Sequence, residues 1–263
     1  MKSRERVMAR RRYVVLSIVS PLALLGLWFL ATREGWVRSV LLPSPQAVLT
    51  SIVDITLSGY SGVSIWSHVV ASLSRVLTAF VAGSILGILI GILRGRAPHF
   101  DAAFVIPAEM LRPIPPLGLI PLFILWFGIG ELSKILLIFT SVFLIMMVNA
   151  QAGTRSCPLD LTRAALSLGA GRGHLFRYVV LPAALPQIMT GLRVSMGTAL
   201  SILVASELLG GDRGLGFIVL DASNFFRTTY VFAGIFLIGL IGLVSDRGLA
   251  LLTRKVVHWE GRR

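Results

Sequence analysis

Long apolar stretches alternate with short polar segments along this chain of 263 residues. A membrane-spanning helix needs roughly 20 mostly apolar residues, and six stretches approach or exceed that length. They lie at about 13–31, 67–93, 102–127, 133–150, 186–208 and 230–252. The pattern predicts an all-α membrane protein with about six transmembrane helices, which we expect to form a single transmembrane domain over residues 1–263.

Two of these stretches have a second interpretation. The stretch 13–31 follows a cluster of Lys and Arg, as in a signal peptide, but it is long enough for a full span and lacks a clear cleavage site, so we interpret it as a retained first helix. The stretch 102–127 is interrupted by prolines. These are Pro113, Pro115, Pro116 and Pro121. A count of five spans with a re-entrant third stretch therefore remains an alternative.

The charge distribution indicates how the chain is oriented. There are 25 Lys and Arg against 12 Asp and Glu, a net charge of +13, yet only 14% of the residues are charged. With a mean hydropathy of +0.83, this composition favours a multi-pass membrane protein over one that binds nucleic acid. With both termini inside, and with Lys134 and Arg247 counted with the segments that flank their stretches, 17 Lys and Arg are cytoplasmic and five are external. The positive-inside rule therefore predicts that both termini are cytoplasmic.

The segment 155–185 is too polar to span a membrane and too apolar to be a flexible linker. Leu161, Ala164, Ala165 and Leu168 recur at helical spacing, which predicts a short amphipathic helix. Its apolar face needs a partner, and the choice from physical chemistry alone is between a second protein and the lipid surface.

The same segment carries a motif. It resembles the signature loop of the inner-membrane permeases of bacterial binding-protein-dependent ABC importers, which reads Glu-Ala-Ala, three residues, Gly, nine residues, Ile, one residue, Leu-Pro. The corresponding residues here are Arg163, Ala164, Ala165, Gly169, Val179, Leu181 and Pro182. Arg163 replaces the family's Glu, so any ion pair made from that position in the family is in doubt in this chain.

The resemblance runs from the first span to the C-terminus and is closest over about 107–220. The stretches that carry it are Arg112-Pro113-Ile114-Pro115-Pro116-Leu117, Trp126-Phe127-Gly128-Ile129-Gly130-Glu131, Leu181-Pro182-Ala183-Ala184-Leu185-Pro186 and Arg213-Gly214-Leu215-Gly216. They are similar to the permeases of the taurine, aliphatic sulfonate and nitrate importers.

This resemblance implies a type I ABC importer permease fold in a bacterial inner (cytoplasmic) membrane. It implies a second permease copy, two ATP-binding subunits and an extracytoplasmic solute-binding protein as partners. The segment 155–185 would hold the coupling helix that docks on the ATPase, with Arg163, Ala164, Ala165, Gly169, Leu181 and Pro182 as its coupling residues. The implied cargo is a small anion, first a sulfonate such as taurine or an alkanesulfonate, with nitrate, bicarbonate or an uncharged pyrimidine vitamin precursor as alternatives.

Four ionisable residues in or near the apolar stretches are candidates for the substrate pathway: Glu109, Arg112, Arg193 and Glu207. A charge at mid-membrane costs about 2.5–3.5 kcal/mol on insertion scales, so such residues usually face a cavity or a partner. The structural alternative is that Glu109 and Arg112, three positions apart, pair with each other on one helix face. Glu207 and Arg75 lie nearer the ends of their stretches, where long side chains can extend to the interface.

No arrangement of residues indicates catalysis. The histidines His68, His99, His174 and His258 lack the spacing of paired metal ligands, and no G-x-x-x-x-G-K-[ST] motif is present. We expect no catalytic residue, no metal and no cofactor in this chain, with ATP and Mg²⁺ bound by the partner ATPase that the resemblance implies. A self-sufficient secondary transporter or channel is the alternative of a different class, although the organised segment 155–185 would have no role in it.

Overall fold

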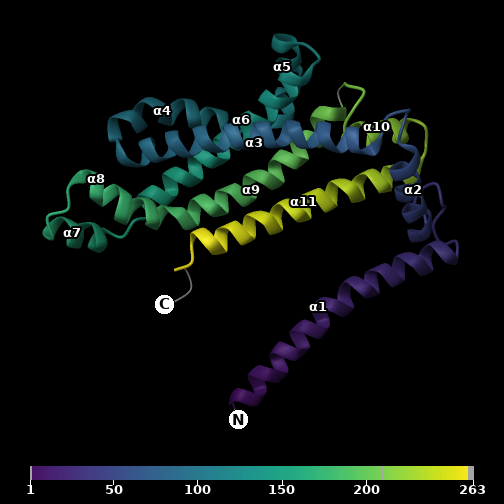
Figure 1. Ribbon diagram of the computed structural model, residues 1–263, viewed down its shortest axis with the longest axis horizontal. Coiled ribbons are helices and arrows are strands. Elements are labelled where there is room, and N and C mark those ends of the chain that lie inside the picture. The colour runs from purple at the N-terminus through teal and green to yellow at the C-terminus, as the bar shows by residue number, and fades with distance from the viewer. Residues whose placement is uncertain (1, 209, 260–263) are drawn as a thin grey trace.

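The computed structural model of the protein describes residues 2–208 and 210–259, and its regular structure is helical (Figure 1). The helices are α1 (Lys2–Arg33), α2 (Pro45–Ser58), α3 (Ile65–Arg96), α4 (Pro98–Leu111), α5 (Ile120–Phe127), α6 (Glu131–Arg155), α7 (Leu159–Ser167), α8 (Arg172–Leu175), α9 (Leu181–Leu208), α10 (Leu215–Asn224) and α11 (Thr228–Val256). A 3₁₀ turn (Pro116–Leu119) precedes α5, and a π-helical turn (Phe176–Val180) precedes α9.

Five helices of the described ranges are long and apolar enough to cross a membrane: α1, α3, α6, α9 and α11. They cover five of the six expected stretches. The remaining one, 102–127, is not a continuous helix, because α4 and the 3₁₀–α5 segment meet at an angle of 87°. Pro113 and Pro115 lie at this bend, where they supply no amide hydrogen and disfavour helical backbone in the residues before them.

Helices α3 and α6 lie side by side and run in the same direction. Gly83 of α3 lies against Val142 of α6, and twelve residues on, Gly95 lies against Thr154. Contacts that advance together along both helices can form only between parallel neighbours. If both helices span the membrane, the chain between them has to return to the side from which α3 started.

Ion pairs at the two ends of the bundle show that α4 and α5 make this return. Asp101, at the start of α4, binds Arg94 and Arg155 at the ends of α3 and α6. Glu131, directly after α5, binds Arg75 near the beginning of α3. The bent pair therefore connects one end of the bundle to the other, and this geometry favours six crossings over a re-entrant third segment.

Small residues let the central helices pack closely. A Cβ atom added at Gly87 of α3 would lie 2.6 Å from Cβ of Met146 in α6, a distance that real Cβ contacts do not reach. Helix α9 packs against α6 in the opposite direction, with Gly191 against Asn149 and Gly153 against Ala184. Glycine at helix contacts permits this approach in membranes, where packing contacts take the place of the hydrophobic effect.

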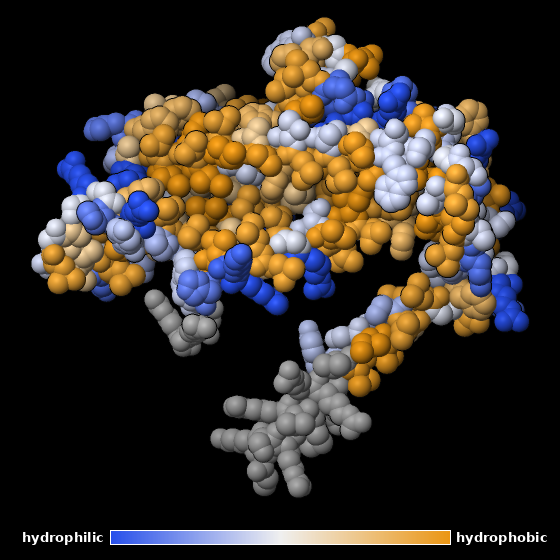
Figure 2. Space-filling view, viewed as in Figure 1, coloured by the Kyte–Doolittle hydropathy of each residue, from blue (hydrophilic) through white to orange (hydrophobic). Residues whose placement is uncertain are grey.

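Helix α1 stands apart from the other helices in Figure 1. Near its end, Trp28 donates a hydrogen bond from Nε1 to the carbonyl of Pro43 at 3.0 Å and stacks obliquely on Phe232 of α11. Figure 2 shows that much of the visible surface of the long helices is apolar, as expected for helices in contact with lipid or with other membrane helices.

Candidate functional site

The segment between α6 and α9 forms the short helices α7 and α8, which project from one end of the bundle (Figure 1). Helix α7 carries three of the motif residues, of which Arg163 and Ala164 are exposed and Ala165 is partly buried. Leu166 and Leu168 are 52% and 89% exposed. The helix thus presents apolar side chains that nothing in the described chain covers, which is typical of an interaction surface.

Helix α7 ends in a Schellman motif that explains Gly169. The amide of Ala170 donates to the carbonyl of Ala165 at 3.0 Å, and the amide of Gly169 donates to Leu166 at 2.9 Å. Gly169 has a φ of +80°, the left-handed conformation that this cap requires and that glycine adopts without strain. The motif's spacing between Ala165 and Gly169 is therefore the spacing of a helix cap.

The motif's Leu181 and Pro182 begin α9, directly after the π-helical turn Phe176–Val180. The amide of Leu181 donates to the carbonyl of Phe176, five residues earlier, and Pro182 has no amide to donate. The guanidinium of Arg96, at the end of α3, lies 4.4 Å from the centre of the Phe176 ring. The turn Phe176–Val180 is therefore continuous with α9, and a cation–π contact also connects it to α3.

Arg112 lies at the bend after α4 and lines a hollow of about 430 Å³ beside α6 and α9. The polar part of the wall comes from Ser141 and Asn149 of α6 and Thr198 of α9. No Asp or Glu of the described ranges lines this hollow or forms an ion pair with Arg112. An arginine in a mostly apolar hollow with hydroxyl and amide groups has the chemistry of an anion site.

Glu109 and Arg193 do not share this arrangement. Glu109 is exposed and does not line the hollow, so the expected alternative of a Glu109–Arg112 pair is absent from the described ion pairs. Arg193 of α9 forms a two-bond fork with Asp246 of α11, with Nε–Oδ1 at 2.9 Å and Nη2–Oδ2 at 3.1 Å. Arg193 and Asp246 line a separate groove between α9 and α11, so the two arginines lie in different hollows.

The interpretation of Glu207 and Arg75 as side chains that extend to the interface is wrong. Glu207 is only 2% exposed, and Oε1 accepts hydrogen bonds from Ser72 at 2.7 Å and from Arg75 at 2.6 Å. Oε2 accepts the amide of Gly216 at 2.8 Å. Glu131 also binds Arg75. This network joins α3, α6, α9 and α10, and it leaves no free side of the Glu207 carboxylate for a solute.

A second set of contacts holds the loop 210–214 on the same end of the bundle. His68 is fully buried, and its Nδ1 accepts the amide of Gly214 at 3.1 Å. The hydroxyl of Tyr60, between α2 and α3, donates to Asp221 of α10 at 2.7 Å. Burial and this hydrogen bond raise the pKa of Tyr60, so its phenol stays protonated and keeps donating.

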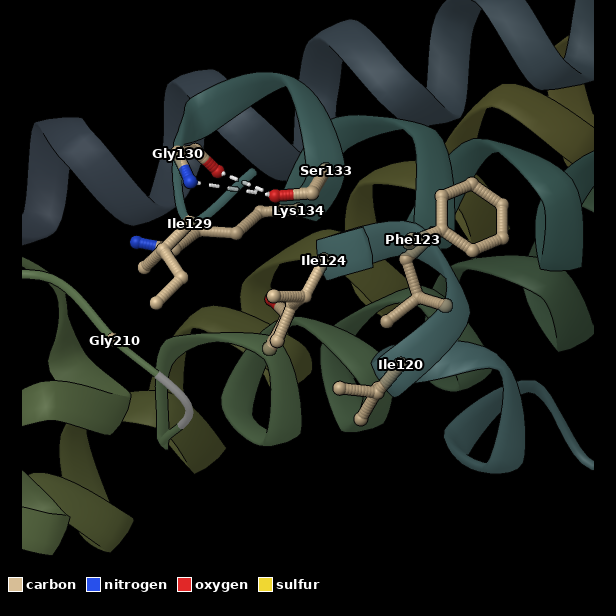
Figure 3. Close-up of a pocket in the computed structure, with 10 residues that line it drawn as sticks. Ile120, Phe123, Ile124, Ile129, Gly130, Ser133, Lys134 and Gly210 are labelled. Carbon is tan, nitrogen blue, oxygen red and sulfur yellow. Dashed lines mark hydrogen bonds between the residues drawn. The ribbon is translucent and has the colours of Figure 1, made fainter. Parts of the chain in front are cut away.

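A small pocket lies beside this network, between α5, α6 and the residue Gly210 (Figure 3). Its walls are mostly apolar, with Ile120, Phe123 and Ile124 on one side and Lys134 on the other (Figure 3). The free volume is about 20 Å³, which is room for a water molecule but not for a solute.

The family comparison agrees with the motif in the segment 155–185 and with the helix arrangement. The family model described as "Binding-protein-dependent transport system inner membrane component" matches residues 83–258. The chain belongs to this family. As a member it is a multi-pass membrane protein and a transport component, the permease of an ABC importer.

Similar curated permeases place the chain in one subfamily. The taurine transport system permease protein TauC of Escherichia coli (strain K12) is 41% identical, over 95% of this chain and 91% of TauC. The putative aliphatic sulfonates transport permease protein SsuC of Bacillus subtilis (strain 168) is 35% identical, over 95% and 90%. The nitrate import permease protein NrtB of Synechocystis is 32% identical, over 83% and 82%. The permease therefore belongs to the taurine, sulfonate and nitrate subfamily.

Solved structures support the fold. An inward-facing structure of the MetNI methionine ABC transporter covers 78% of this permease and 98% of the matched chain, with a TM-score of 0.58 and 18% sequence identity. At that identity the likeness concerns the fold, which is that of a type I ABC importer permease.

Asp246, the partner of Arg193, is not among the residues that the sequence pattern singled out. Asp246 is the only acidic residue of the apolar stretch 230–252. The rule that singled out Arg193, the cost of a charge within a span, applies equally to Asp246 and would have found it.

Proposed function

We propose that this permease carries a small anionic solute, most favourably a sulfonate such as taurine or an alkanesulfonate, across the membrane in an ATP-driven importer. The observation that carries the proposal is Arg112, a cation in a hollow of about 430 Å³ without a carboxylate among its lining residues. The subfamily adds support, since relatives are named for taurine, aliphatic sulfonates and nitrate.

The hollow suits an anion for electrostatic reasons. A charge interaction at 4 Å is worth about 1 kcal/mol in water and about 4 kcal/mol at the effective dielectric constant near a protein surface. In the wall, the hydroxyls of Ser141 and Thr198 already donate to carbonyls of their own helices. Arg112 and the second amide hydrogen of Asn149, whose first is donated to Ile145, are therefore the donors that the lining offers an anion. Two permease copies that face each other with their Arg112 hollows would enclose the pathway. Nitrate and bicarbonate are also small anions and would suit the same groups.

ATP hydrolysis belongs to separate subunits in this proposal. Two ATP-binding subunits would receive the exposed leucines of α7, with Arg163, Ala164 and Ala165 on the docking helix. Their movement would reach the bundle through Leu181 and Pro182 into α9, and through the Arg96–Phe176 contact into α3. The pathway would then open alternately to a solute-binding protein outside and to the cytoplasm.

The proposed orientation gives a topology prediction. If both termini and α7 are cytoplasmic, reporter fusions after residue 160 and at the C-terminus will show cytoplasmic activity, and fusions near residues 55 and 218 will show external activity. Lys and Arg are concentrated in the segments placed inside, which is the physical reason. An external signal from α7 would contradict the docking of an ATPase there.

Uptake by an Arg112→Gln variant tests the function. We expect uptake of taurine or ethanesulfonate per assembled complex to fall at least about tenfold, equivalent to about 1.4 kcal/mol, because the anion loses its countercharge. Arg112→Lys keeps the charge without the planar fork and should retain an intermediate rate.

Glu109→Gln is the matched control, because Glu109 is a neighbouring exposed charge outside the hollow. Membrane abundance and binding of the ATPase should be unchanged in all three variants. Equal uptake by Arg112→Gln and Glu109→Gln would overturn the proposed role of the hollow.

A further inference from the structure

The ion pair between Arg193 and Asp246 lies within the membrane-spanning part of the bundle, towards the end marked by Arg94. Arg75, the partner of Glu207, and Arg94 bound the uncharged stretch of α3, and they are about 28 Å apart at 1.5 Å per residue. This matches a hydrocarbon core of about 30 Å. Arg193 precedes Glu207 in α9 by about 21 Å on the same measure. Arg193 therefore lies inside the apolar zone, about 7 Å from the level of Arg94 on the same measure.

The protomer does not enclose this pair. The side chains of Arg193 and Asp246 are 45% and 46% exposed. Their fork uses two of the five N–H donors of the guanidinium. Charged side chains within membrane spans mostly face a water-filled cavity or the interior of an assembly and pair with one another. The exposed pair therefore marks a face that water or protein covers in the assembled importer.

One exposed side of α9 lies between the Arg193–Asp246 pair and the Arg112 hollow. Thr190, Val194, Gly197 and Ser201 are exposed on α9 and fall within about 60° of arc at 3.6 residues per turn. On one side of this stripe, Val194 borders the Arg112 hollow. On the other, Gly197 and Ser201 border a groove of about 570 Å³ between α9 and α11, which Arg193 and Asp246 also line.

The walls of that groove favour passage of a small solute. The lining residues besides the ion pair are apolar or small, among them Gly197, Leu200 and Ser201 of α9 and Ile235, Gly239 and Gly242 of α11. No other charged residue of the described chain lines it. Arg193 is thus the one cation, and Asp246 the one anion, that a solute in this groove would meet.

We propose that Asp246 is the resident counter-ion of Arg193 in the solute pathway, and that the anionic group of the solute replaces the Asp246 carboxylate on the guanidinium during passage. The inference rests on the proposed anion transport. A sulfonate presents two oxygens to the same fork of N–H donors that Asp246 now occupies. Because Asp246 competes for Arg193, the solute binds weakly enough to leave, and Asp246 sets the affinity.

The test uses the complete importer with its ATPase and binding protein, reconstituted in proteoliposomes. Radiolabelled ethanesulfonate is the probe, with taurine and nitrate as further anions. Two readouts are needed: equilibrium binding of the probe to the membrane complex, and the maximal uptake rate per complex. Asp246→Asn should bind the probe at least about threefold more tightly and release it more slowly, because the competing carboxylate is gone.

Further variants separate this role from a structural one. The double variant Arg193→Gln with Asp246→Asn leaves neither charge without its partner, so it should assemble normally yet bind and transport the probe about tenfold less well. Arg193→Lys keeps the ion pair but not the fork and should also lose affinity. Arg247→Gln, an exposed cation one residue after Asp246 that lines neither hollow, should behave like the unmodified importer.

Wild-type binding and transport by the double variant would overturn the inference and leave the pair as a simple tie between α9 and α11. Unchanged probe binding by Asp246→Asn would overturn it as well. Either result would leave the proposed function intact, because the unmodified importer would still carry the anion. If the unmodified importer carries none of the three anions, the proposed function fails and the counter-ion role fails with it.

Discussion

Replacing Glu207 by alanine is expected to destabilise the α10 end of the bundle by about 3–5 kcal/mol, the range for breaking a buried ion pair by removing one partner. The carboxylate accepts hydrogen bonds from Ser72, Arg75 and the amide of Gly216. Without it, the buried guanidinium of Arg75 retains only Glu131 as a charged partner. The loop before α10 also loses its attachment to α9.

Thermal unfolding of the purified permease in detergent would measure this effect. Asp212→Ala is the control, because Asp212 has an 89% exposed side chain in the same loop and should leave the melting temperature nearly unchanged. Adding Arg75→Ala to Glu207→Ala should destabilise by less than the sum of the two single changes, since the two charges depend on each other. A melting temperature for Glu207→Ala equal to that of the control would contradict the network.

Sequence alone gives the local features of this fold because they depend on near neighbours. Apolar length identifies the spans, and Pro113 and Pro115 predict an interruption after α4. The choice between six crossings and a re-entrant segment depends on the parallel packing of α3 and α6. That packing shows only in contacts such as Gly83 with Val142, which no local pattern reveals.

For the charged residues, too, the sequence indicates which ones lie in apolar stretches but not which partners they meet in the fold. Arg75 and Glu207 are 132 positions apart, so their position near the ends of apolar stretches suggested solvent contact while the fold brings them together. Arg112 and Arg193 are equivalent in sequence terms, each a cation within an apolar stretch. The partner Asp246, 53 positions from Arg193, is what distinguishes them.

Gly169 is the opposite case, because the motif singles it out in the sequence and the structure supplies a physical reason for glycine at that position. Its positive φ closes the Schellman cap of α7, while a Cβ added there would meet no atom of the described chain within 4 Å. The requirement for glycine is therefore conformational and not steric. A side chain at this position would strain the backbone of the cap without disturbing the packed bundle.

Replacing Gly169 by valine should consequently abolish transport while the permease still folds and inserts. A β-branched residue is a genuine outlier at positive φ, and left-handed backbone costs roughly 1–2 kcal/mol for residues with a Cβ. The end of α7 would then unwind, and Leu166 and Leu168 would lose the positions from which we propose they contact the ATPase. ATP-dependent uptake and solute-stimulated ATP hydrolysis by the reconstituted complex should both fall at least about tenfold.

Two neighbouring substitutions make this prediction specific. Gly171 also has open space around it, but its φ is −69°, so Gly171→Val should be tolerated and serves as the matched control. Gly169→Asn should retain much of the activity, because asparagine adopts left-handed backbone more readily than valine. Permease abundance should be equal in all three variants. If Gly169→Val hydrolyses ATP and transports solute as well as Gly171→Val does, the cap of α7 is not part of the connection between the ATPase and the spans.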